Sequence, residues 1–460
     1  MMFRFAAAWL VAVTALTAAQ DAPPKATFYR DVLPILQRQC QECHRPGAVA
    51  PMPFTTYRET RPWARAIKES ILSRKMPPWF ADPALSGHFA NERRLSQEQV
   101  ATLTAWVDGG APEGDAKDKP PAARFAEGWS IGQPDMVVEF PREISVPSTQ
   151  LLKWIRSSPP PPPSASGDIQ EHVLLVKVGF PRDVWVKAAE IHPGNPRAVH
   201  HMKVWIRPPG SEWMKDAKGG ELLDPSDSQF AMATSASGPE LKPRAINDIL
   251  ATYNPGGNPR DLVVEGAAKF IAAGSDLIFD IHYSALTTDE TDRSQVGIVF
   301  EKNLPSRRLV TTTSIANTNF TIPARATDYE VRAESVLQTE TLLVWVQPHM
   351  HLRARDYELR AHFPDGASQT LVKGGFDFNW QQSYVFAKPV TLPKGTRLET
   401  DAHFDNSANN PFNPKPDADV KYGPLTSDEM AVSYLGFIIG ANDDPARIFA
   451  GPASVGEVKR

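Results

Sequence analysis

The run Leu342-Leu343-Val344-Trp345-Val346 is short and apolar, and its residue types favour extended backbone, so it predicts a buried β-strand. Clusters of Pro, Gly, Asn and Asp separate it from similar runs, a pattern that is typical of all-β sandwiches. Proline accounts for 43 of the 460 residues. Because proline cannot donate to a sheet ladder, most of it is expected at sheet edges and in loops, including a polyproline II loop at Pro159–Pro163. The other predicted strands are Met136–Phe140, Val173–Val178 and Leu277–Tyr283.

The chain divides into several predicted parts. Residues 25–114 have helical spacing, and a capping box at Ser96 and Gln99 begins a helix that Gly109 ends. Residues 115–124 are polar and contain proline, so they are interpreted as a linker. The remainder is too long for one β core. We therefore expect two β domains, at 125–310 and 311–455.

The N-terminus predicts export. A basic start is followed by an apolar stretch of about a dozen residues and then by small residues, as in a secretory signal peptide at 1–19. The alternative, an uncleaved membrane anchor, would need about 20 apolar residues. We expect a periplasmic or secreted protein with no stable membrane insertion after cleavage. The formal net charge of −4 lacks the positive excess that is typical of nucleic-acid-binding proteins, so no nucleic-acid partner is expected.

The two cysteines of the chain lie together in Cys40-Gln41-Glu42-Cys43-His44. Thiols at this spacing can form two thioether bonds to one haem, and His44 can then bind its iron. The alternative is a thioredoxin-like redox pair, which would need a βαβ setting instead of helical surroundings. The motif therefore predicts one covalent haem c, and it leaves no cysteine for disulfides.

Met76 is the expected sixth ligand of the haem iron, and Met52 is the weaker candidate. A methionine buried in the core is the alternative reading for either residue. Ligation by His and Met raises the haem potential, which suits electron transfer. With this motif, a late methionine and a closing helix, residues 25–114 resemble small class-I-type c cytochromes.

Several histidines form a second group. His349 and His351 follow a predicted strand two residues apart, so they point to the same side and could chelate one metal. The adjacent His200 and His201 could share a metal only if the strand end bends. His282 lies on the polar side of another strand. A single histidine is more often structural, but the joint pattern in an exported β-rich region favours metal ligation.

The type of metal follows by elimination. No cysteine remains for blue copper or structural zinc, and no HxD or HxE pair offers an iron facial triad. Imidazoles with a thioether suit copper that cycles between Cu(I) and Cu(II). A methionine donor is therefore expected as well.

Four segments of the β region contain these histidines and a late methionine: Ala198–Met202, Phe279–Tyr283, Pro348–His351 and Thr426–Met430. Through these segments, which occur in the family's order, the β region resembles the copper type II, ascorbate-dependent monooxygenases, which include peptidylglycine α-hydroxylating monooxygenase and dopamine β-monooxygenase. The resemblance implies two jelly-roll-like sandwiches with one mononuclear copper on each, facing each other across a solvent-filled cleft. It also implies that His200, His201 and His282 hold the electron-transfer copper. The copper at which O2 and substrate react would be held by His349, His351 and Met430.

The sequence departs from this family at several positions. Gln347 stands where the peptide hydroxylases have an arginine that grips a substrate carboxylate, and Val432 replaces an assisting asparagine. Tyr434 matches a tyrosine used in the same grip. The family's disulfides cannot form, because both cysteines are committed to haem. A peptidylglycine substrate is therefore not expected.

The expected fold is a small all-α cytochrome c domain followed by two all-β jelly-roll-like sandwich domains. The expected function is a copper monooxygenase that hydroxylates a C–H bond of a small organic substrate with O2. Its catalytic residues would be His349, His351, Met430 and Tyr434. An external donor would reduce the haem, which would pass electrons to the coppers. The alternative is a non-catalytic redox relay or copper-binding module.

Overall fold

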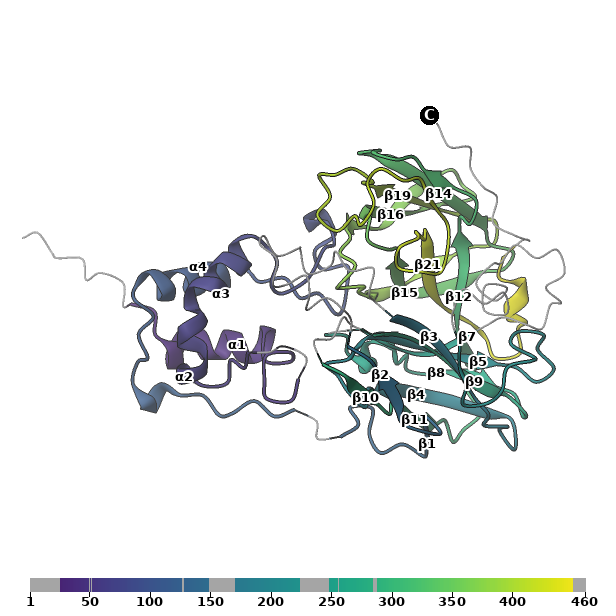
Figure 1. Cartoon of the computed structure of the whole chain (residues 1–460), viewed down its shortest axis with the longest axis horizontal. Helices are drawn as coiled ribbons and strands as arrows, with labels where there is room; N and C mark the ends of the chain where they lie inside the picture. The colour runs from purple at the N-terminus through teal and green to yellow at the C-terminus, as the bar shows by residue number, and fades with distance from the viewer. Residues whose placement is uncertain are drawn as a thin grey trace, which may run out of the picture.

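The computed structural model describes residues 25–48, 50, 52–125, 128–148, 170–223, 248–254, 256–283 and 288–449. The expected signal peptide at 1–19 and the Pro159–Pro163 run lie outside these residues. The described chain is mostly β-sheet, with a small helical region towards its N-terminal end (Figure 1). No helix in this part of the chain is long and apolar enough to cross a membrane.

The helical region packs around the fully buried Phe28 and Trp106. The helix predicted after Ser96 is confirmed. Ser96 Oγ accepts from the Gln99 N–H at 3.1 Å, and Gln99 Oε1 accepts from the Ser96 N–H at 2.9 Å. A cytochrome c fold is not evident from this arrangement. The helices are η1 (Phe28–Val32), α1 (Leu33–Gln39), α2 (Tyr57–Thr60), η2 (Arg61–Trp63), α3 (Ala64–Leu72), η3 (Pro83–Leu85), α4 (Gln97–Asp108) and η4 (Ala116–Asp118).

The first β half is sandwich-like. A five-stranded sheet with the order β6-β3-β9-β5-β7 packs against strands β1, β11, β4 and β8 over one apolar core. The predicted strands at Met136, Val173 and Leu277 are confirmed as β1, β3 and β9. The strands are β1 (Met136–Glu139), β2 (Ile144–Val146), β3 (Gln170–Val176), β4 (Val184–His192), β5 (Val199–Arg207), β6 (Leu222–Leu223), β7 (Asp248–Tyr253), β8 (Ala267–Ile271), β9 (Asp276–Tyr283), β10 (Glu290–Asp292) and β11 (Gln295–Phe300).

The second β half has the same layered design. A four-stranded sheet with the order β14-β19-β16-β17 packs against β12, β21, β15 and β18 over a second core. The run that begins at Leu342 is confirmed as β15. The strands are β12 (Arg307–Ala316), β13 (Thr321–Ile322), β14 (Tyr329–Val336), β15 (Thr341–His349), β16 (Ala354–His362), β17 (Ser368–Gly375), β18 (Tyr384–Leu392), β19 (Arg397–Phe404), β20 (Val420–Lys421) and β21 (Val432–Gly440).

The two β halves share one eight-stranded sheet, because β8 and β12 pair in parallel at Ala267 and Arg307. Figure 1 shows the halves stacked, with β15 and β21 above β3, β5 and β9. A third apolar cluster lies between them and includes Trp205, Trp345 and Tyr434. This cluster fills the interface between the two halves.

The segment after the third helix leaves the helical region and joins the second β half. Trp79 and Phe89 are part of the core of that half. Asn91 ties the segment down, because its Nδ2 donates to Ser383 O at 2.8 Å and its Oδ1 accepts from the Val385 N–H at 3.1 Å. Residues 79–91 therefore belong structurally to the β region, although we expected them in the helical domain.

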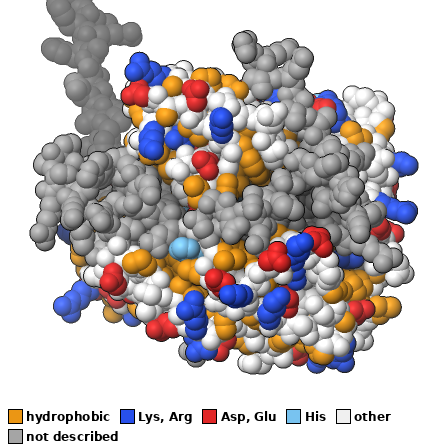
Figure 2. Space-filling model, turned by 45° about the vertical axis from the view of Figure 1, so that its right-hand side comes forward, with side chains coloured by type: hydrophobic (Ala, Val, Ile, Leu, Met, Phe, Trp, Pro, Cys, Tyr) orange, Lys and Arg blue, Asp and Glu red, His pale blue; other side chains and the backbone are white. Residues whose placement is uncertain are grey.

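Acidic and basic side chains are interspersed on the described surface in Figure 2. No single sign of charge dominates that face.

Candidate metal centre

His200 and His201 lie near the start of β5. The pairing of β5 with β9 shifts register between Val199 and His201, which is the mark of a β-bulge. A bulge interrupts the strict alternation of strand side chains. As a result the Nδ1 atoms of His200 and His201 lie 2.9 Å apart, and the irregular strand end that shared ligation by this pair would require is present.

His282 lies opposite His201 in the same sheet. The two are register partners between β9 and β5, and their ring centroids are 3.8 Å apart. Alternation along β9 explains the orientation: Phe279 and Ile281 enter the core of the first half, so His282 points to the opposite face. That face is turned towards the second β half.

His349 and His351 approach the same place from the second half. Their ring centroids are 5.4 Å apart, which confirms that they lie on the same side. The ring centroids of His201 and His349 are 6.3 Å apart, so the two predicted ligand sets meet between the halves. Phe378 packs beside both sets, with ring centroids 5.3 Å from His200 and 6.2 Å from His351.

This arrangement differs from the solvent-filled cleft that the resemblance implied. His201, His282 and His349 are each at most 5% exposed. The physical reason is the apolar cluster between the halves, in which Trp205 and Tyr434 pack with ring centroids 6.2 Å apart. Burial of this surface brings the two histidine sets together.

Four imidazole nitrogens of the cluster are buried and have no hydrogen-bond partner. Leaving a buried polar atom unsatisfied costs about 1–3 kcal/mol, and a bound metal would satisfy it. Imidazole and thioether donors suit copper. The residues therefore fit the copper predicted from the sequence. The four atoms are His200 Nε2, His201 Nε2, His282 Nδ1 and His351 Nε2.

No three His, Cys, Asp or Glu side chains in the described ranges already converge as a metal-binding group. Two features of the donor set account for this. The set of His349, His351 and Met430 contains two imidazoles and takes its third donor from sulfur. In the other set, His200 and His201 turn their Nδ1 atoms towards each other.

The imidazoles of the cluster are held in their neutral form. Burial lowers the pKa of His200 to about 4 and that of His351 to about 3. Burial also holds the pKa values of His201, His282 and His349 well below the ordinary value. The neutral ring is the form that binds a metal.

Lys203 is a buried charge that sequence reasoning missed. Its Nζ lies 3.8 Å from Asp280 Oδ2 and 4.9 Å from the centroid of the Tyr434 ring. Burial lowers the pKa of Lys203, but Tyr434 and Asp280 more than offset this, and the pKa is raised. The positive charge disfavours protonation of the nearby histidines. Lys203 could have been predicted to lie near the histidines, because it stands two residues after His201 and therefore on the same face of β5.

Met430 and Tyr434 lie in the same interface between the halves. Both are buried in the apolar cluster between the halves, and the Tyr434 ring centroid lies 5.5 Å from that of His349. The Glu429 carboxylate accepts from the His351 N–H at 2.9 Å and from the Arg353 N–H at 2.6 Å. Glu429 therefore ties the segment that carries Met430 to the segment that carries His351.

Gln381 is a second residue that sequence reasoning missed. It is buried, and its Oε1 lies 2.6 Å from His349 Nδ1. An acceptor at this distance keeps the proton on Nδ1 and leaves Nε2 of His349 for a metal. The Gln381 backbone oxygen accepts from Gln347 Nε2 at 3.0 Å. Gln347, which stands where the peptide hydroxylases have an arginine, therefore supports the loop that carries Gln381. The tandem glutamines after Trp380 carried no motif that would have indicated this role.

The cysteine motif lies in the helical region, and its two cysteines are not bridged. His44 Nδ1 lies 3.0 Å from Met52 O, and the His44 ring stacks on Phe54 with centroids 4.3 Å apart. A carbonyl on Nδ1 orients the ring and leaves Nε2 for iron. Burial raises the pKa of the Cys40 thiol to about 12. The residues of the motif fit a covalent haem.

Met76 is half-buried, and its N–H donates to Ser70 O at 3.2 Å. No hydrogen bond or ring contact in the described part of the chain joins Met76 to His44. Met52, the weaker candidate from the sequence, contacts His44 through its carbonyl and packs against the helical core.

No protein-family model and no curated protein match the chain. Solved structures with partial likeness include the infectious bursal disease virus VP2 subviral particle. It is 7% identical, with 69% of this chain and 74% of that chain covered and a TM-score of 0.19. The structure of the Gx strain of that virus is 9% identical, with coverages of 69% and 75% and a TM-score of 0.19. Likeness at these TM-scores carries no argument about function.

Proposed function

We propose that the protein is an exported haem- and copper-dependent oxidoreductase, a monooxygenase that hydroxylates a C–H bond of a small organic substrate with O2. One observation carries this proposal: four partnerless imidazole nitrogens are buried together where the two β halves meet, and Met430 is buried in the apolar cluster of the same interface. Two separate sheets supply these donors, so the centre forms where the two β halves meet. Such a set of soft and nitrogenous donors suits copper.

Each sheet would hold one copper. His200, His201 and His282 come from the first half, and the bulge in β5 brings the adjacent pair to one side. His349, His351 and Met430 come from the second half, where Glu429 and Gln381 fix the segment and the ring orientation. When bound, the coppers would supply the oxygen chemistry, and the haem, reduced by an external donor, would supply single electrons.

The surrounding residues would shape the substrate side. Tyr434 lies against His349 and Lys203, so its phenol is held beside the second ligand set. Gln347 brings no positive charge, which supports a substrate other than a peptide carboxylate. The apolar cluster of Trp205 and Trp345 excludes water from the interface between the halves.

The helical region would serve as a c-type cytochrome. Cys40 and Cys43 would attach the haem and His44 would bind its iron, with the ring orientation set by Met52 O. Met76 is the proposed sixth ligand. A redox group on this region would stand next to the copper region, because residues 79–91 enter the core of the second β half.

The decisive experiment compares two methionine variants of the full chain. Met430→Leu removes the proposed thioether donor, whereas Met350→Leu makes the same change at a buried methionine in the neighbouring core. We expect Met430→Leu alone to lose about one copper equivalent and O2-dependent turnover with a reduced haem. Metal analysis, copper EPR and O2 uptake measure these effects. Wild-type protein without copper above background, or full turnover by Met430→Leu, would overturn the proposal.

A second candidate is a non-catalytic redox relay or copper-binding module. The burial of His201, His282 and His349 supports it, because a relay needs no opening for substrate. Carbon monoxide separates the two functions, since it binds reduced copper only where a coordination position is open. Binding of carbon monoxide to the reduced protein supports the monooxygenase, and its absence in copper-loaded protein supports the relay.

A further inference from the structure

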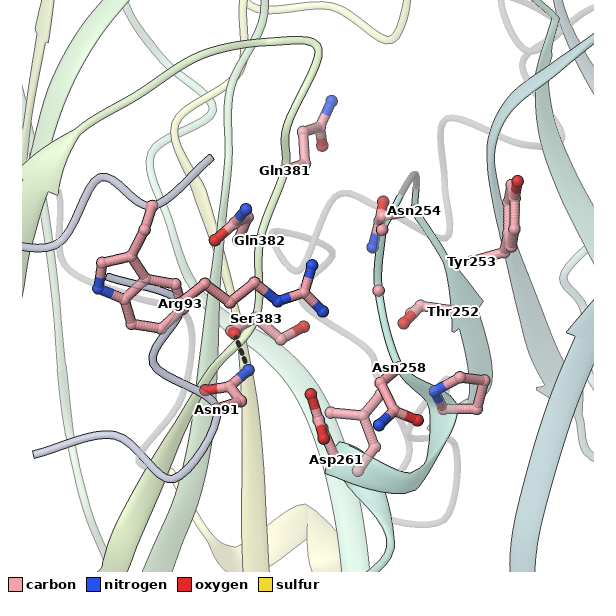
Figure 3. Close-up of a pocket in the computed structure, with 15 residues that line it drawn as sticks. Asn91, Arg93, Thr252, Tyr253, Asn254, Asn258, Asp261, Gln381, Gln382 and Ser383 are labelled. Atoms are coloured by element: carbon pink, nitrogen blue, oxygen red, sulfur yellow. Dashed lines mark hydrogen bonds between the residues drawn. The ribbon is translucent and has the colours of Figure 1, made fainter. Parts of the chain in front are cut away.

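An open cavity of about 580 Å³, counted with the solvent at its mouth, separates the N-terminal segment from two loops of the β region. Asn91 and Arg93 line one side, and Tyr253 and Asn254 line the other (Figure 3). Gln381 and its neighbours form a third wall. The lining combines apolar surface with polar side chains, and it contains both an aromatic ring and a guanidinium, so it suits a flat, partly charged ligand.

The cysteine motif reaches the edge of this cavity at Gly256. A Cβ atom on Gly256 would lie 3.2 Å from Cys43 Sγ, 3.1 Å from Arg93 Nη1 and 3.8 Å from Trp380. The φ angle of Gly256 is 74°, a conformation that favours glycine. Cys43, Arg93 and Trp380 therefore converge on one point, which a larger side chain at position 256 would occupy.

Arg93 brings a positive charge into this space. Figure 3 shows its guanidinium extending across the cavity towards the segment that carries Asn254, just after β7. It forms no ion pair with any carboxylate in the described ranges, whereas the adjacent Arg94 pairs with Glu92 at 3.0 Å. The Asp261 carboxylate of the same cavity attracts this guanidinium without forming an ion pair with it. A half-buried guanidinium that forms no direct ion pair, beside Cys43, is placed to bind a further carboxylate.

The far wall of the cavity leads to the histidine cluster. Gln381 lines the cavity and also bonds to His349 at 2.6 Å. Tyr253 lines it from β7 and is the register partner of Met202, the residue after His201. One or two residues therefore separate the cavity from both proposed copper ligand sets.

We propose that this cavity seats the carboxylate-bearing edge of the haem attached at Cys40 and Cys43, and that Arg93 pairs with a haem propionate. The haem is thus shared between the helical region and the β region, with Gly256 allowing close approach. This inference rests on the proposed function, because it requires a covalent haem at the cysteine motif.

The test uses the full-length, haem-loaded protein and measures the haem midpoint potential by spectroelectrochemistry at pH 8. A nearby positive charge favours the reduced haem, so Arg93→Gln lowers the potential and Arg93→Lys restores most of it. Arg94→Gln is the matched control and leaves the potential unchanged, because the charge of Arg94 is already paired. Asp261→Asn removes a negative charge from the same cavity wall and shifts the potential upward.

Opposite shifts for Arg93→Gln and Asp261→Asn are a charge effect that a merely structural role would not produce. Unchanged potentials in both variants, or equal shifts in Arg93→Gln and Arg94→Gln, would overturn this inference and leave the proposed function standing. Wild-type protein without covalent haem, judged by its pyridine haemochrome spectrum, would overturn both. If Arg93→Gln fails to fold, Arg93→Lys and Asp261→Asn decide the question.

Discussion

Replacing Gln381 with leucine removes the acceptor that holds His349 in one tautomer. The Gln381 Oε1 to His349 Nδ1 distance is 2.6 Å, and both side chains are buried, so water cannot take over the bond. Loss of such a supporting bond typically weakens metal binding about 10- to 100-fold. At 1.4 kcal/mol for each factor of ten, this is about 1.4–2.8 kcal/mol. We expect this loss for one of two copper equivalents.

A competition titration of copper against a chelator measures this effect directly. Gln382→Leu is the matched control, because Gln382 donates to Pro78 O and lines the same cavity without touching His349. Gln381→Glu keeps an acceptor oxygen and should retain most of the affinity. The reasoning fails if Gln381→Leu binds both coppers within twofold of wild type, or if Gln382→Leu weakens binding equally.

Three further predictions concern stability. Lys269→Met leaves Asp248 buried without its partner at 2.7 Å, so the free energy of unfolding measured with denaturant should fall by about 3–5 kcal/mol. Adding Asp248→Asn should recover most of this loss. A double variant as unstable as Lys269→Met alone would contradict this prediction. Partial burial raises the pKa of Glu399, but Arg397 and Arg360 hold it at about 2, below its ordinary 4.5. The stabilisation that ionised Glu399 gives the folded protein is therefore full above pH 4.5 and lost as the pH falls towards 2. Glu399→Gln should flatten the dependence of the melting temperature on pH in that range. An unchanged slope would refute this prediction. Ser96→Ala should cost about 1 kcal/mol and speed amide exchange in α4, whereas Ser96→Thr should not.

The sequence predicted those parts of the molecule that short-range rules determine. The helix after Ser96 follows from its capping box, and β9 and β15 follow from short apolar runs. The same-side placement of His349 and His351 follows from strand alternation. The bend at His200 was recognised as a requirement, although only the register of β5 against β9 shows how a bulge provides it.

Contacts between distant segments could not be predicted in this way. The 6.3 Å approach of His201 and His349 depends on how two sheets pack, and no local pattern encodes that packing. Gln381 lies in a loop without periodicity, so its bond to His349 had no signal. The apolar residues of 79–91, such as Trp79 and Phe89, do not recur at strand or helix spacing, and their place in the second core was therefore missed.

The anchoring of residues 79–91 also sets an order of events in time. Asn91 finds its partners Ser383 and Val385 only 292 and 294 residues later in the chain. Contacts of such long range form late, because the intervening chain must first be ordered. The N-terminal segment can therefore take its place only after the start of β18 has been made and ordered. Over that interval Cys43 and Gly256 are still apart, and the thiols of the motif are less enclosed than in the folded protein.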